Sequence, residues 1–169
     1  NGAAGNDLFE AQVFNGSTLE ILPGKGNDTV SISGMTSTVT LNVAVAGVNN
    51  FGNDLFQFDT AAGAVSIAGN IYGGQGNDSF NFSDGIDLNA ATVWGNQGSD
   101  NLSLTANESA SFQSSKIGLG KDNDSATVAF TTADLNSFTL SGGQGKETFQ
   151  WNLAGINQSG NNLFEAGGG

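Results

Sequence analysis

Gly73-Gly74-Gln75-Gly76-Asn77-Asp78-Ser79-Phe80-Asn81 is the stretch that decides the fold of this chain. Its glycines and its Asn-Asp pair favour a tight turn. Phe80 and Phe82 lie two positions apart, which indicates a strand that buries one face. The stretch therefore predicts a sharp corner that leads directly into a half-buried strand.

The Gly-Asn-Asp triplet recurs along the chain. Identical copies lie at 5–7, 26–28, 52–54 and 76–78, and near-copies lie at 98–100, 122–124 and 145–147. The acidic members are separated by 21 to 26 residues. Apolar residues follow most of them at the second and fourth positions, and another short apolar stretch precedes the next corner. A fixed unit of this length is typical of a solenoid.

We therefore predict an all-β fold, a parallel β-solenoid of about seven coils of roughly 23 residues. Residues 1–169 are expected to form a single solenoid domain that is a segment of a longer or repeating chain. An antiparallel sandwich would account for the strands and glycines, but not for one corner sequence at the same point of every unit. The phenylalanine columns are expected in the core. Trp94 and Tyr72 lie near corners, where they could be exposed, and packing is the favoured expectation for both.

The composition excludes most enzyme chemistry. The chain has no Cys and no His, which removes thiolate nucleophiles, the commonest general base and the usual ligands of zinc. We predict no catalytic residues and no organic cofactor. The net charge of −12 argues against nucleic acid as a partner, and we expect no insertion into a membrane.

Stacked coils would place the corner aspartates in one column, where neighbouring carboxylates repel each other. Calcium would relieve this repulsion, because it accepts carboxylate and backbone carbonyl oxygens with loose geometry. The predicted metal ligands share these corners: Asp28, Asp54, Asp78, Asp100, Asp124, Gly26, Gly52, Gly74, Gly76 and Asn77. A metal-free corner is the alternative, with Asp and Asn side chains accepting backbone hydrogen bonds. Lys25, Lys121 and Lys146 at the corners could also neutralise the column.

Residues 73–81 resemble the nonapeptide of the RTX (hemolysin-type) repeat proteins, G-G-x-G-x-D-x-U-x with U apolar. Residues 142–150 fit the same pattern with Glu147 in place of Asp, and residues 24–30 and 95–102 fit it in part. The resemblance implies a calcium-binding turn followed by a strand, in a protein that is exported and folds outside the cell when it meets calcium. The chain departs from that family by carrying one motif per coil of about 23 residues, where RTX rolls usually carry two per shorter coil.

These observations predict a secreted, non-enzymatic structural module of a surface layer, filament or adhesin. Its expected partners are further copies, arranged end to end or side by side, and a surface polysaccharide. Two alternatives remain open: the secretion and folding module of an exported enzyme, and a carbohydrate-binding β-helix.

Overall fold

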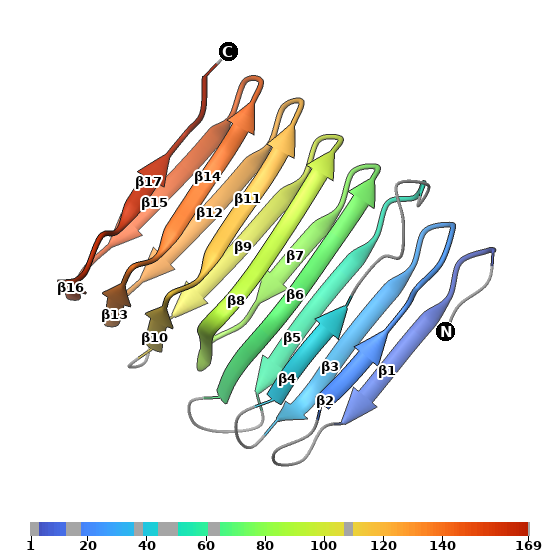
Figure 1. The fold of residues 1–169 in the computed structure, drawn as a ribbon, viewed down its shortest axis with the longest axis horizontal. Coiled ribbons are helices and arrows are strands. Elements are labelled where there is room, and N and C mark those ends of the chain that lie inside the picture. Colours follow the sequence, from blue (N-terminus) through green and yellow to red (C-terminus); the bar gives the residue numbers. More distant parts are fainter. Residues whose placement is uncertain are drawn as a thin grey trace.

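The computed structural model describes residues 4–12, 18–35, 39–43, 51–60, 65–106 and 110–168. Its regular elements there are all β-strands, which pair in parallel and stack coil upon coil (Figure 1). The chain is thus a parallel β-solenoid, as the repeat predicts. It makes about six turns, slightly fewer than the seven coils expected. Among the described residues there is no helix long and apolar enough to cross a membrane.

The first sheet is formed by the strands that follow the acidic corners. They pair in the order β1-β3-β5-β7-β9-β12-β15. Their bounds are Leu8–Gln12 (β1), Thr29–Met35 (β3), Leu55–Thr60 (β5), Ser79–Phe82 (β7), Asn101–Ala106 (β9), Ser125–Phe130 (β12) and Thr148–Leu153 (β15).

The second sheet faces the first and contains the strands that lead into the corners (Figure 1). In the first part of the chain these are β2 (Thr18–Ile21), β4 (Val39–Val43), β6 (Val65–Gln75) and β8 (Ile86–Gln97). In the later coils, two shorter strands replace the single strand that leads into the corner. They are β10 (Ala110–Gln113) and β11 (Lys116–Lys121), β13 (Ala133–Asn136) and β14 (Thr139–Gln144), and β16 (Ile156–Ser159) and β17 (Leu163–Glu165). The long β8 joins the two arrangements, because its first half pairs with β10 and its second half with β11.

The register of the first sheet stacks equivalent residues directly upon one another. Phe56 pairs with Phe80 and Phe58 with Phe82, and both pairs of rings are stacked with centroids 5.0 Å apart. All four rings are at most 1% exposed. The alternation of apolar and polar residues along these strands therefore produces the predicted phenylalanine columns between the two sheets.

The apolar core is less completely buried in the first and last coils that the structure describes. Buried residues occupy the central coils, whereas the partly buried residues packed against them belong to the first and last coils. These are Phe9, Ala11, Leu19, Phe149, Leu153, Ile156 and Phe164. Trp151 stacks on Phe149 at 5.0 Å and meets Phe164 edge-on at 5.1 Å, and it remains 39% exposed.

Candidate functional site, a buried acidic column

The corner acids form one continuous hydrogen-bonded column. In each coil the backbone N–H of the corner acid donates to the carboxylate of the corner acid in the next coil. Asp54 N–H donates to Asp78 Oδ1 at 2.8 Å, and Asp78 N–H donates to Asp100 Oδ1 at 2.8 Å. The same bond links Asp7 to Asp28, Asp28 to Asp54 and Asp100 to Asp124, and the column closes on Glu147 Oε2 at 3.1 Å. The five predicted aspartates are thus brought together, along the interior of a corner.

These carboxylates are buried, which the repeat pattern does not predict. Asp28, Asp54, Asp78, Asp100 and Asp124 are only 1–2% exposed. The second carboxylate oxygen has no hydrogen-bond partner at four of them and in Glu147; these atoms are Oδ2 of Asp28, Asp78, Asp100 and Asp124, and Oε1 of Glu147. Buried polar atoms without a partner are uncommon and often mark an ion or a proton-dependent site.

Glycines make room for the unpartnered oxygens. A Cβ atom on Gly73 would collide with Asp78 Oδ2, and one on Gly95 would collide with Asp100 Oδ2 and the carbonyl of Leu119. The motif predicts Gly74 as part of the site, but the adjacent Gly73 makes this contact. Gly74 instead pairs with Asn96 at the end of its strand. The pair of adjacent glycines in the motif is the sequence signal for this space. Only the first glycine of the pair, Gly73, faces the carboxylate of Asp78.

The corner asparagines form a second column that runs in the opposite sense. Each asparagine Oδ1 accepts the backbone N–H of the equivalent residue in the next coil. Asn53 accepts from Asn77 at 2.8 Å, and Asn77 accepts from Ser99 at 2.8 Å. The bonds Asn27 to Asn6, Asn53 to Asn27 and Lys146 to Asn123 continue the pattern. This column confirms that backbone capping by asparagine operates at the corners, and it includes the predicted ligand Asn77.

The glycines of the triplets let successive coils approach closely. A Cβ on Gly76 would collide with the carbonyl of Gly52, and one on Gly52 with the carbonyl of Gly26. Asp122 takes the glycine position in its own coil with a φ of 80°, a left-handed conformation that aspartate tolerates better than most residues. Its Oδ2 accepts the N–H of Gly98 at 3.2 Å. Glycine is therefore not obligatory at every corner, since Asp122 is accommodated there and its carboxylate accepts a backbone N–H of the preceding coil.

Burial raises the pKa of the central acids. The pKa of Asp78 is raised to about 7, that of Asp100 to about 8 and that of Asp124 to about 6. Loss of hydration is the largest cause in all three, and neighbouring carboxylates add to it. The N–H donated from the preceding coil lowers each pKa but does not outweigh burial. Near neutral pH the column therefore needs either protons or a cation to offset its charge.

Lysine does not supply that cation to the interior at Asp78, Asp100 and Asp124. Lys25, Lys121 and Lys146 are exposed, whereas the acids are buried. A nearby ammonium group would lower the pKa of a carboxyl group, and no lysine has this effect on the three acids. These lysines therefore do not offset the burial of the three acids.

The donor set suits a hard cation only in part. The unpartnered carboxylate oxygens are the kind of ligand that calcium prefers. However, each coil supplies one acid to the column, with Asp122 as one additional acid beside it, and no three Asp, Glu, His or Cys side chains gather around one point in the part of the chain that the structure describes. An ion between two coils would have to take its remaining ligands from backbone carbonyls. Calcium at the predicted residues stays a prediction.

No family model, no curated protein and no solved structure matches the chain. The RTX assignment of the repeat therefore rests on its motif alone, although the solenoid fold and the stacked aspartates agree with it in general terms.

The opposite edge carries a second polar column that the sequence pattern did not reveal. The register aligns Asp87, Ser111, Asp134 and Asn157. Asp87 Oδ1 accepts the N–H of Ser111 at 2.6 Å, and Asp134 Oδ1 accepts from the Asn157 side chain at 2.8 Å. Burial, and to a smaller extent the charge of Asp134, raises the pKa of Asp87. The spacing of 24, 23 and 23 residues is regular, but the position alternates between Asp, Ser and Asn, so no constant residue type marks this column in the sequence.

Proposed function

We propose that this chain is a non-enzymatic structural module of an extracellular or cell-surface assembly, in which solenoids join end to end. The observation that carries the proposal is the partial burial of core residues in the first and last coils that the structure describes. Phe149 and Phe164 are only partly buried at one end, and Phe9 at the other. Solenoids normally cover such ends with capping elements, because exposed strand edges and core residues invite association.

The register indicates how two such ends fit. A copy stacked on the last coil would place its β1 beside β15, with Phe9 over Phe149 and the small Ala11 over the large Trp151. The acid column of one copy would then continue into the acid column of the next copy, because Glu147 and Asp7 occupy the same position in their coils. The contact would reproduce the interface between neighbouring coils within the chain.

Sedimentation velocity over a range of protein concentrations tests the end-to-end contact. We expect the sedimentation coefficient to rise with concentration, and the rise to be lost in Trp151→Asp, which adds a charge in the last coil that the structure describes. Gln57→Asp adds the same charge to the exposed side of the rod and serves as the control. A wild-type monomer at all concentrations contradicts the proposal, and a loss of association only in Gln57→Asp indicates side-by-side packing instead.

We propose further that calcium offsets the charge of the acidic column. The support is the row of buried carboxylate oxygens without hydrogen-bond partners, together with the RTX-like motif. Calorimetric titration of EDTA-treated protein with calcium, alongside thermal melts, tests this part. We expect saturable binding and a higher Tm at pH 8, and a smaller effect of magnesium. No heat and an unchanged Tm mean that protons and hydrogen bonds alone maintain the corner.

A further inference from the structure

The outer surface of the second sheet carries an exposed tryptophan that the core does not use. Trp94 lies on β8 and is 37% exposed. Its register partner on β11 is Gly118, and a Cβ on that glycine would collide with the six-membered ring of the indole. The ring therefore extends across the neighbouring strand over a residue without a side chain. Tyr72 on β6 is the register partner on the other side. Contrary to the sequence expectation, Trp94 is a surface aromatic and not a core residue.

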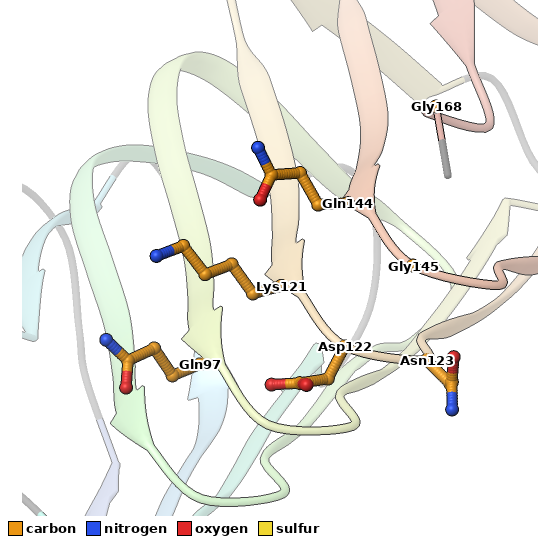
Figure 2. Close-up of a pocket in the computed structure, with 7 residues that line it drawn as sticks. All are labelled: Gln97, Lys121, Asp122, Asn123, Gln144, Gly145 and Gly168. Atoms are coloured by element: carbon orange, nitrogen blue, oxygen red, sulfur yellow. The ribbon is translucent and has the colours of Figure 1, made fainter.

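A polar groove begins three residues further along the same strands. Gln97, Lys121 and Gln144 lie in register on β8, β11 and β14. Figure 2 shows their side chains in a row, extended to the same side, with Asp122 beside them; all four line one groove. The row is about 10 Å from Trp94 along the strand. Between the aromatic and the row, β11 and β14 carry Gly120 and Gly143, whereas β8 carries the exposed Asn96, whose side-chain amide donates to the carbonyl of Trp94 at 3.5 Å.

We infer that Trp94 and this groove bind a neutral saccharide chain. A sugar ring has one face of C–H groups that packs against an aromatic ring, and a rim of hydroxyls that both donate and accept hydrogen bonds. Glutamine amides serve both roles, Lys121 adds donors and Asp122 adds an acceptor. The combination of one flat apolar platform and several convergent polar groups is the general composition of a small-ligand site. The net charge of −12 disfavours acidic polymers, which selects neutral glycans.

This inference goes beyond the proposed structural role, because it concerns the side of the rod and does not depend on its ends or on calcium. The glycan would run from Trp94 along the strand toward the corner. There it would meet the row of Gln97, Lys121 and Gln144, which crosses three successive coils. A rod with such a site could attach to a polysaccharide while its ends stay available for other copies.

Tryptophan fluorescence tests the inference on the whole chain. Trp151→Phe leaves Trp94 as the single tryptophan. The probes are hexasaccharides of β-1,4-linked glucose and of β-1,4-linked N-acetylglucosamine, with oligogalacturonate as the anionic comparison. We expect a saturable change in Trp94 emission with at least one neutral probe and none with the anionic one. No change with either neutral probe, or a response to the anionic probe alone, overturns the inference.

A matched pair of double variants separates the groove from general surface effects. Gln97→Ala with Gln144→Ala should weaken binding about tenfold, because two hydrogen-bonding groups are lost. Gln57→Ala with Gln150→Ala removes two exposed amides from the other sheet and should leave affinity unchanged. Trp94→Ala, followed by calorimetry, should abolish binding while circular dichroism remains that of the folded protein. Equal affinity in the two double variants, or full affinity in Trp94→Ala, contradicts the assignment.

Discussion

At the scale of single residues, the corner depends on two kinds of position, an acid that is buried and a glycine that makes space for it. Asp100 shows both dependencies. Its Oδ1 accepts the N–H of Asp78, and its Oδ2 lies against Gly95 without a partner. A change at either residue alters the same small volume, but a substitution of the acid changes charge and a substitution of the glycine changes packing.

Gly95→Ala should destabilise the protein by about 2–4 kcal/mol, because the new methyl group would collide with Asp100 Oδ2 and with the backbone of the next coil. Urea unfolding monitored by circular dichroism measures the change. Gly168→Ala is the matched control, since nothing lies within 4 Å of a Cβ placed there. Equal stabilities of the two variants would show that the corner has room to spare at Gly95.

Metal-free protein should lose stability as the pH rises from about 5 to 8. The pKa of Asp78, Asp100 and Asp124 is raised in the folded chain to about 7, 8 and 6, so the folded state keeps protons that the unfolded chain releases. Stability that is present at low pH is therefore lost as the pH passes through these folded values. Thermal melts in EDTA should show a Tm roughly 5–10 °C lower at pH 8 than at pH 5.

Asp100→Asn should flatten this pH dependence, because an amide resembles the protonated acid and does not titrate. The drop in Tm between pH 5 and pH 8 should be smaller than in the wild type, and calcium should raise the Tm of the variant less. Asp59→Asn changes an exposed acid outside the column and should keep the wild-type profile. A wild-type profile in Asp100→Asn would mean that other groups carry the pH dependence.

At the scale of elements, each strand is held by the same contacts to the coil before and the coil after it. β7 shows this arrangement, since it pairs with β5 on one side and with β9 on the other and buries Phe80 and Phe82. The stacked rings add aromatic contacts to the burial of apolar surface. Loss of one ring therefore leaves a cavity in a column whose neighbours are fixed by the sheet.

Phe80→Ala should cost about 3–5 kcal/mol of unfolding free energy, because the ring is fully buried and its neighbours cannot close the gap. Phe51→Ala removes the same number of atoms from a side chain that is 58% exposed, and should change stability by less than about 0.5 kcal/mol. Denaturant unfolding of both variants gives the comparison. A small effect of Phe80→Ala would mean that the coils can shift to refill the column.

Much of the fold could be predicted from the sequence, because period-two alternation and a repeated corner determine both the strands and their stacking. Spacing alone predicts that Phe56 and Phe80 lie in one column, and the register confirms it. The division of the later coils into two strands could not be predicted. Ser114 and Ser137 have left-handed backbone at the break, but Ala90 has the same conformation within the continuous β8, and neither serine nor alanine gives a strong local signal for it.

The site could be predicted only in its residue positions. The corner spacing brought the five aspartates together, but not the direction of their side chains. Whether a carboxylate points into the corner depends on the space left by Gly73 and Gly95 and on the N–H groups of the preceding coil. Those are features of the stacked structure, and no single repeat contains them.

At the scale of the whole molecule, the solenoid has no single centre, because each coil contacts mainly its neighbours. Stability should therefore vary along the rod, from low values in the first and last coils to the highest values in the middle coils. Hydrogen exchange monitored by mass spectrometry should show slow exchange in β7, β9 and the second half of β8, and fast exchange in β1, β15 and β17. Uniform protection along the chain would contradict this independence of coils.

The two corner columns also give the rod a direction. Along the acid column the earlier coil donates and the later coil accepts, whereas along the asparagine column the earlier coil accepts and the later coil donates. The two ends of the rod are thus chemically different, because each column presents donors at one end and acceptors at the other. A fibre built by repeating this contact would be polar along its length, and its two tips would recruit new subunits at unequal rates. Surfaces that hold such fibres could orient them all the same way through one tip.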